Sequence, residues 1–333
     1  MVRVGEDLNR ALHALVAKDP RVYVLGEDIA DPYGGAFKIT KGLTTRFPER
    51  VLTTPISEAG FTGVASGLAL CGDKVIVEVM FADFLSLAFD QIVNFAAKSV
   101  SMYGEPTPIR MVVRCPAGGQ RGYGPTHSQS PQKHFIGVPH LSIYELSPFH
   151  ANAEVLATML ATGHPCLFVE DKSLYAQRQY DASTVDDLFS YDYVDPERNY
   201  ARVFMNTPEA ADNLILAPGG LFHRALSATR RLFLETERLC QIVVPSRLYP
   251  FDVRPLRPLL DRIPLVYVVE ESTAGGTWGA EVAVRIYDEM WGQLRHPVRL
   301  IHSRDSVIPT ASHLERQVIV QDSDIFQALQ REP

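Results

Sequence analysis

A single carboxylate, Glu58, stands inside a neutral run of small and apolar residues, Thr-Pro-Ile-Ser-Glu-Ala-Gly-Phe at residues 54–61. The run follows a short strand pattern at residues 51–52 and opens an apolar stretch over residues 60–70, which predicts a buried helix. Two roles fit an acid in this place. A carboxylate in the first turn stabilises a helix through its dipole and its free N–H groups. A carboxylate in an apolar pocket instead has a raised pKa, and it can exchange a proton with a ring nitrogen of a ligand.

Met80 and Phe84 follow a predicted strand at residues 74–79, and a helix is expected from about residue 83 to residue 100. Side chains at the carboxyl ends of parallel strands form the edge where doubly wound sheets bind ligands. An aromatic ring there can stack on a flat heterocycle. Packing in the core is the alternative interpretation for Met80 and Phe84 taken singly.

A glycine-rich loop, with glycines at positions 118, 119, 122 and 124, ends in Thr-His-Ser-Gln-Ser at residues 126–130. Glycines allow a loop to approach a ligand closely. The hydroxyl and amide neighbours of His127 could fix its tautomer, as a proton-transfer residue requires. A solvated histidine on a surface loop is the alternative. The sequence shows no zinc-ligand spacing, no P-loop and no Gly-x-Gly-x-x-Gly after a strand.

The elements expected to position these residues alternate between strand and helix, which predicts a parallel sheet with helices on both faces. We assign this first domain to residues 1–180, with strands near residues 21–26, 51–52, 74–79, 109–114, 141–144 and 166–169. The next segment is polar and lacks apolar periodicity, so residues 181–207 are predicted to be a linker. A second, smaller α/β domain follows in residues 208–333, with strands near residues 213–217, 240–244, 265–270 and 298–302.

Composition excludes several classes of function. A net charge of −7 argues against nucleic acid as the main partner. No apolar run reaches the roughly 20 residues that a membrane-spanning helix needs. The cysteines are scattered and form no Cys-x-x-Cys pair, so we expect buried or half-buried free thiols, no metal site in this chain and a cytoplasmic location. The four thiols are those of Cys71, Cys115, Cys166 and Cys240.

Taken together and in this order, these segments resemble the β subunit of the thiamine-diphosphate-dependent decarboxylase component of 2-oxo acid dehydrogenase complexes. This transketolase-like family includes pyruvate, branched-chain and acetoin dehydrogenases. The resemblance covers nearly the whole chain, through residues 25–29, 33–37, 40–43, 54–61, 78–84, 89–94, 96–98, 127–130, 270–271, 275–276, 279–282 and 308–309. It implies a doubly wound pyrimidine-binding domain followed by a smaller α/β C-terminal domain.

The resemblance implies a specific role for Glu58, which matches the glutamate that hydrogen-bonds nitrogen N1′ of the aminopyrimidine ring of thiamine diphosphate. Protonation of that nitrogen favours the imino tautomer, whose exocyclic nitrogen can remove the thiazolium C2 proton. A carboxylate in an apolar pocket is suited to share its proton in this way. Glu27 matches an acid that lies close to the cofactor.

Other residues match the walls and the reactive end of the family's site. Met80 and Phe84 match residues that flank the pyrimidine, and Ile56 lies beside it. The cofactor-binding residues expected in this chain are therefore Glu27, Ile56, Glu58, Met80 and Phe84. His127 matches the histidine that faces the thiazolium C2, where it would orient the 2-oxo acid or the incoming lipoyl group and transfer protons.

The resemblance also implies a partner. The family holds the diphosphate through Mg²⁺ with a Gly-Asp-Gly…Asn motif that belongs to the α subunit, and this chain has only Cys-Gly-Asp-Lys at residues 71–74. We therefore expect this chain to supply the pyrimidine half of each site, within an α₂β₂ heterotetramer. A fully active single chain would be expected to exceed 333 residues. A lipoyl transacylase core is a further expected partner.

The sequence departs from the family pattern in several places, among them residues 310–313, where Thr-Ala-Ser-His replaces a more typical Tyr-Ala-Pro. Gln120, Arg121 and Tyr123 stand where small residues are usual before the histidine, which would narrow or charge the substrate entrance. Arg121 could pair with a substrate carboxylate or reach into solvent. Thr162 and His164 replace the Asp and Asn of the family's potassium-binding loop, which puts that ion in doubt. These changes suggest a specialised substrate or acyl acceptor, as in a biosynthetic pathway.

The function predicted from the sequence is decarboxylation of a 2-oxo acid and transfer of the acyl group, with a lipoyl carrier as the acceptor. One alternative is an acyl or two-carbon transferase with the same cofactor, which would perform carboligation or use a carrier thiol. Another is a non-catalytic scaffold for an α-like subunit. The presence of Glu58, Phe84 and His127 favours an enzyme.

Overall fold

The computed structural model describes residues 2–205, 208–209 and 211–331, and in it the chain forms two compact α/β units. The first unit contains the chain up to Ala117 together with Phe135–Leu146 and Ala151–Gln179. The second contains Gly118–His134, Ser147–His150 and the chain from Tyr180 onward. The predicted two-domain α/β architecture is confirmed, but the chain passes between the units several times before residue 180.

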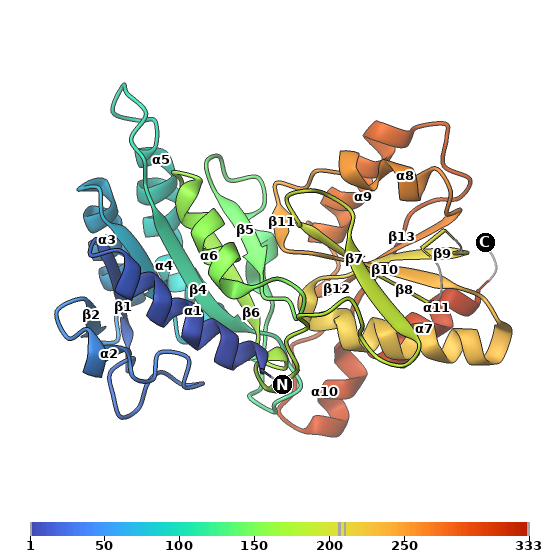
Figure 1. Ribbon diagram of the computed structural model, residues 1–333, viewed down its shortest axis with the longest axis horizontal. Helices are drawn as coiled ribbons and strands as arrows, with labels where there is room; N and C mark the ends of the chain where they lie inside the picture. The colour runs from blue at the N-terminus through green and yellow to red at the C-terminus, as the bar shows by residue number, and fades with distance from the viewer. Residues whose placement is uncertain (1, 206–207, 210, 332–333) are drawn as a thin grey trace. The chain divides into compact units, whose positions relative to one another are not determined.

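Six strands of the first unit pair in parallel, in the order β5-β6-β4-β3-β1-β2 (Figure 1). Most of their residues are buried, because helices cover both faces of the sheet. The longer strands therefore consist mainly of apolar residues, whereas short β2 is half polar, and the sequence predicted each strand within a few residues. The strands are β1 (Val22–Glu27), β2 (Val51–Thr54), β3 (Lys74–Glu78), β4 (Met111–Ala117), β5 (Ser142–Glu145) and β6 (Cys166–Asp171).

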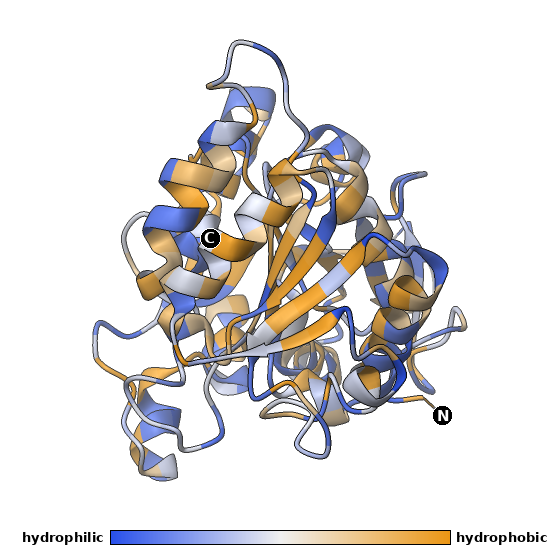
Figure 2. Cartoon of the chain, turned by 90° about the vertical axis from the view of Figure 1, so that its left-hand side faces the viewer, coloured by the Kyte–Doolittle hydropathy of each residue, from blue (hydrophilic) through white to orange (hydrophobic). Residues whose placement is uncertain are grey.

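Helices α1 (Val4–Lys18) and α6 (Asn152–Ala161) pack against each other and share one core with the sheet (Figure 1). Leu8 and Leu12 of α1 recur at helical spacing and are fully buried there. Figure 2 shows the strands mainly in the hydrophobic colour, while the helices carry hydrophobic and hydrophilic residues. Two shorter helices complete this part, α2 (Leu43–Arg46) and η4 (Leu174–Ala176).

Helix α3 (Glu58–Leu70) packs on β3 and on the helical segment that follows it. That segment was predicted as one helix, and it is a succession of short ones with a π-helical turn in the middle. Its parts are η1 (Ala82–Phe84), α4 (Leu85–Asp90), the π turn η2 (Gln91–Ala96) and α5 (Ala97–Ser99).

The sheet of the second unit has the order β13-β12-β9-β10-β8-β7, in which β7 and β8 are antiparallel to their neighbours. Helices α7 and α11 pack against each other over its core. The strands are β7 (Phe189–Tyr193), β8 (Tyr200–Met205), β9 (Asn213–Leu216), β10 (Cys240–Pro245), β12 (Leu265–Thr273) and β13 (Arg299–Ser303), and β11 (Arg247–Tyr249) is a further short strand. The helices are η5 (Gly219–Leu221), α7 (Phe222–Thr236), η6 (Arg254–Leu256), α8 (Arg257–Leu260), α9 (Trp278–Met290), α10 (Ser312–Val318) and α11 (Asp322–Gln330).

The segment 181–207, predicted to be a linker, contains β7 and β8. In β7, Phe189 and Tyr191 are buried while the intervening Ser190 and Asp192 are partly exposed. An antiparallel strand at the sheet edge has one exposed face, so its sequence alternates between apolar and polar residues. This alternation made the segment look polar overall. Residues 206–207 at the end of the expected linker lie outside the described residues.

The thiols differ in accessibility. Cys115, Cys166 and Cys240 are buried, whereas Cys71 at the end of α3 is exposed, contrary to our expectation, and none of these four described residues forms a disulfide. Within the part of the chain that the structure describes, no helix combines the length and the apolar character needed to cross a membrane.

Candidate active site

Three carboxylate-bearing segments meet at one edge of the first unit's sheet. Strands β3, β1 and β2 are parallel neighbours, so their carboxyl ends lie at the same edge. Glu27 ends β1 and pairs with Thr54, the last residue of β2. Glu78 ends β3 and pairs with Gly26 of β1. This register brings Glu27, Glu78 and the segment that carries Glu58 together.

Glu58 is the first residue of α3 and is only 6% exposed. The preceding residue, Ser57, caps the helix without a side-chain hydrogen bond. A carboxylate in this first turn benefits from the free N–H groups and the dipole of the helix. The first-turn position and the burial, which the sequence presented as alternatives, therefore occur together.

Glu27 is 3% exposed, and its Oε2 atom has no hydrogen-bond partner among the described residues. Burial raises the pKa of Glu27 above its ordinary value, and the negative charges of Glu58, Asp28 and Glu78 raise this pKa further. An acid that is buried, unpaired and close to a second acid is characteristic of a functional site. Glu27 can thus give or accept a hydrogen bond at this edge.

Replacing Glu27 by glutamine is expected to stabilise the cofactor-free chain in a pH-dependent way. The raised pKa means that the ionised carboxyl destabilises the folded state, and this cost vanishes when the pH falls below 4.5, the ordinary pKa of the group. The Glu27→Gln variant should therefore have the higher free energy of unfolding at pH 7, and its advantage should shrink as the pH falls toward 4.5. Urea unfolding across this range measures the difference, and an advantage that does not change with pH would contradict the prediction.

Apolar side chains flank the carboxylates. Met80 and Phe84 are half-buried just beyond β3, and the Phe84 ring meets that of Phe81 edge-on at 6.2 Å. Phe81 in turn meets Phe37 edge-on at 5.7 Å. Ile56, on the turn between β2 and α3, is 78% exposed. The edge thus combines buried acids with partly accessible apolar surfaces.

A buried ionic network lies behind this edge. Arg114 of β4 is fully buried and donates to Glu78 and, in a bidentate pair at 2.8 and 2.6 Å, to Glu170 of β6. The Tyr175 hydroxyl also donates to Glu170, at 2.6 Å. Burial raises the pKa of Glu78. This network was not predicted, although the charged residues at the ends of two apolar strand patterns, Arg114 and Glu170, were a signal for it.

The buried carboxyl of Glu78 leaves no space for a side chain at the neighbouring position 35. Gly35 lies in the turn after β1 and has a φ of +78°. A Cβ atom at Gly35 would lie 2.7 Å from Glu78 Oε1. Glycine is required there because both the backbone conformation and the close approach exclude a side chain.

His127 lies in the second unit, in the loop Gly118–His134, although the sequence placed it in the first domain. It is half-buried, and its Nδ1 atom is 2.8 Å from Thr126 Oγ1. Its backbone N–H donates to the carbonyl of Gly124 at 3.4 Å. The Thr126 hydroxyl is thus a hydrogen-bond partner of the ring, and which of the two donates depends on the tautomer.

The residues of the first unit fit a flat heterocycle with a polar edge. Glu27 Oε2 is a buried oxygen without a partner among the described residues, so a ligand donor or acceptor can satisfy it. The half-buried Met80 and Phe84 offer apolar faces for the ring. The structure therefore brings together Glu27, Glu58, Met80 and Phe84, with Ile56 exposed on the adjoining turn.

The residues that replace potassium ligands are occupied by bonds within the chain. Thr162 Oγ1 donates to the carbonyls of Met159 and His164 at 2.7 and 3.0 Å. His164 Nε2 is 2.8 Å from Ser142 Oγ. In residues 2–205, 208–209 and 211–331, no group of three or more His, Cys, Asp or Glu side chains is placed to hold a metal ion.

Comparison with known proteins gives two family matches. The family described as "Transketolase, pyrimidine binding domain" matches residues 1–178, and the one described as "Transketolase, C-terminal domain" matches residues 206–325. A solved structure titled "Split gene transketolase, inactive beta4 tetramer" superposes with a TM-score of 0.72 at 20% identity, over 99% of this chain and 97% of that one. These matches confirm the fold class predicted from the sequence.

Relatives align along almost the full chain. Pyruvate dehydrogenase E1 component subunit beta-2 (mitochondrial) of Oryza sativa subsp. japonica is 33% identical, over 98% of this chain and 85% of the relative. The 2-oxoisovalerate dehydrogenase subunit beta 2 (mitochondrial) of Arabidopsis thaliana is 32% identical, over 91% and 81%. The pyruvate dehydrogenase E1 component subunit beta of Rickettsia conorii is 28% identical, over 99% and 98%.

Proposed function

Because the chain belongs to the family of β subunits of 2-oxo acid dehydrogenase E1 components, we propose that it is the pyrimidine-side subunit of a heteromeric, thiamine-diphosphate-dependent 2-oxo acid decarboxylase. The observation that carries this proposal is the pair of buried acids, Glu27 and Glu58, at the carboxyl edge of the first unit's sheet. Buried acids beside apolar walls are suited to exchange protons with a flat heterocycle.

Each residue of the edge has a distinct task in this proposal. Glu58 holds and exchanges a proton with the ring nitrogen of the aminopyrimidine. Glu27 contributes a second hydrogen-bonding carboxyl, while Met80 and Phe84 flank the ring and keep water away from it. Ile56 covers the ring from the adjoining turn. When bound, the cofactor supplies a carbon nucleophile for the carbonyl of the 2-oxo acid.

His127 is proposed as the group that orients the 2-oxo acid or the acyl acceptor and transfers protons. The contact between Thr126 Oγ1 and His127 Nδ1, at 2.8 Å, supports this role because it selects one orientation of the ring. Arg121 and Tyr123 are exposed on the same loop, where they can influence which substrate is accepted.

The remaining half of the site is proposed to come from a partner. An α-like subunit would hold the diphosphate through Mg²⁺, in an α₂β₂ assembly, and a lipoyl group on a transacylase core would receive the acyl group. A reducing compartment such as the cytoplasm is in keeping with four cysteines that form no disulfide.

The proposal is tested by purifying the chain from its native cells and identifying bound proteins by mass spectrometry. The complex is then assayed for thiamine-diphosphate-dependent CO₂ release from a panel of 2-oxo acids, with and without a lipoyl domain. We expect an α-like chain with a Gly-Asp-Gly…Asn motif, CO₂ release, and acyl transfer to the lipoyl domain. Carboligation without a lipoyl acceptor would instead assign the chain to the transferase class. A complex that neither binds the cofactor nor decarboxylates would overturn the proposal.

A further inference from the structure

Two buried carboxylates of the second unit bind the beginning of the histidine-bearing loop. The backbone N–H of Gly119 donates to Glu271 Oε1 at 2.7 Å. The next backbone N–H, that of Gln120, donates to Glu315 Oε1 at 2.8 Å. Glu271 lies near the end of β12, and Glu315 lies in α10 and is only 2% exposed. Consecutive backbone donors of the loop are thus held by acids from two different elements.

Arg224 of α7 strengthens this attachment. Its Nη1 atom pairs with Glu271 Oε2 at 2.7 Å, which compensates the buried negative charge. When the Gln120 amide is oriented with its oxygen toward Arg224, this oxygen accepts hydrogen bonds from Arg224 Nε and Arg224 Nη2 at 2.9 and 3.1 Å. Gln120 has a φ of +66°, a conformation that residues other than glycine rarely adopt. The arginine and the carboxylates therefore hold Gln120 in a backbone conformation that would otherwise be unfavourable.

The close fit extends to Gly119. A Cβ atom on Gly119 would lie 3.1 Å from both Glu315 Oε1 and Ile319 Cδ1. This contact is tighter than ordinary packing, so the loop approaches α10 as closely as a glycine permits.

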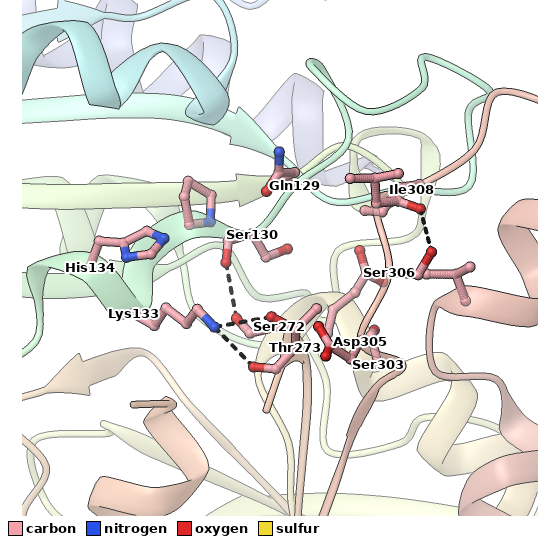
Figure 3. A pocket seen from close by; sticks show the side chains of 14 residues that line it. Gln129, Ser130, Lys133, His134, Ser272, Thr273, Ser303, Asp305, Ser306 and Ile308 are labelled. Carbon is pink, nitrogen blue, oxygen red and sulfur yellow. Dashed lines mark hydrogen bonds between the residues drawn. The ribbon is translucent and has the colours of Figure 1, made fainter. Parts of the chain in front are cut away.

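The other end of the loop is held by the residues that follow Glu271 in β12. Ser272 Oγ donates to the carbonyl of Ser130 at 2.9 Å, and Lys133 Nζ donates to the carbonyl and hydroxyl of Thr273 at 3.0 and 3.1 Å (Figure 3). These residues line a cavity of about 290 Å³ in the second unit. Three successive residues of one strand thus bind both ends of the loop.

His127 lies between these two attachments. The backbone N–H of Gly118 donates to the carbonyl of Gln129 at 3.1 Å, which closes the loop on itself. Gln129 Nε2 donates to the carbonyl of Pro125 at 2.8 Å, which supports the turn before the histidine. A shift at either attachment would therefore move the imidazole ring.

We propose that Glu271 and Glu315 are positioning residues that set the place of His127. They act through the backbone of the loop and not on the substrate. The inference rests on the proposed function, since it presupposes that His127 takes part in the reaction. According to this inference, the reaction also depends on α10 and on the end of β12, because these elements position His127.

The test uses the enzyme assembled with its partner chain and compares two variants of Glu315. Glu315→Ala removes the acceptor for the Gln120 N–H, and it is expected to lower kcat by about 10- to 100-fold, the range that a displacement of about 1 Å can cause. Glu315→Gln retains an acceptor oxygen and should recover kcat to within about threefold of the wild type. Affinity for thiamine diphosphate should not change, because Glu27 and Glu58 are untouched. Hydrogen exchange of the peptide covering the loop should rise in Glu315→Ala and return in Glu315→Gln.

A second variant and three controls make the outcome decisive. Ser272→Ala loosens the other attachment by removing one hydroxyl, and it should raise hydrogen exchange in the loop and lower kcat. This variant tests the proposal even if Glu315→Ala fails to fold. Glu235→Ala, which removes an exposed carboxylate from α7, should change neither quantity. Unchanged kcat and loop exchange in both Glu315→Ala and Ser272→Ala, or full activity of His127→Ala, would overturn the positioning role. Full activity of Glu58→Gln would instead overturn the proposed function.

Discussion

The Glu58→Gln variant of the assembled enzyme is expected to release CO₂ about a thousandfold more slowly than the wild type, in line with the loss of a proton-transferring group. Glutamine has nearly the same size and can still form hydrogen bonds, but it cannot give up or take a proton at neutral pH. Glu58 is buried at the start of α3, so solvent cannot readily replace its carboxyl. The measurement is kcat for the preferred 2-oxo acid at saturating thiamine diphosphate.

The matched control is Glu49→Gln, which makes the same chemical change at an exposed position of the same unit. It should retain the wild-type kcat. Binding of thiamine diphosphate to Glu58→Gln, followed separately, distinguishes a lost proton transfer from a lost site. A rate for Glu58→Gln close to that of the wild type would show that the carboxyl of Glu58 does not transfer the proton.

The Arg114→Met variant is expected to lose about 3–5 kcal/mol of the free energy of unfolding, the usual cost of leaving buried charges without a partner. Arg114 is fully buried and is hydrogen-bonded to both Glu78 and Glu170. Methionine fills much of the same volume, so the loss reports on the two carboxylates more than on a cavity. Denaturant unfolding of the cofactor-free chain measures it.

Two further variants separate charge from packing in this network. Arg10→Met, at an exposed position of α1, should leave the free energy of unfolding almost unchanged. Adding Glu78→Gln and Glu170→Gln to Arg114→Met should restore much of the loss, because no unpaired buried charge then remains within this network. If Arg114→Met lost as little free energy of unfolding as Arg10→Met, the ionic network would not contribute to stability.

The parallel strands were predictable because burial on both faces leaves a continuous apolar run, and α1 was predictable because Leu8 and Leu12 recur at helical spacing. Strand β1, expected at residues 21–26, occupies Val22–Glu27, and β10, expected at residues 240–244, occupies Cys240–Pro245. Antiparallel β7 was not predictable in the same way, because its polar outer face breaks the run.

The candidate site was predictable only where its residues are close in sequence to a strand end. Glu58 follows β2 after a short turn and Phe84 lies in the 3-10 helix after β3, so the parallel topology places both segments at one edge of the sheet. The contact of Gln120 with Glu315 joins residues 195 positions apart, and no local pattern marks such a pair. Long-range packing decides these contacts, and a single sequence does not reveal it.

The assignment of Gly118–His134 to the second unit has a consequence for hybrid proteins built from two related β subunits. A single junction near residue 180 would combine the histidine loop of one parent with the β12 and α10 of the other. The loop would then contact the α10 segment of the other parent, so its fit would depend on the residues that this parent carries at the positions of Glu315 and Ile319. A functional hybrid must exchange the loop together with the C-terminal half, so the natural unit of exchange is discontinuous in the gene.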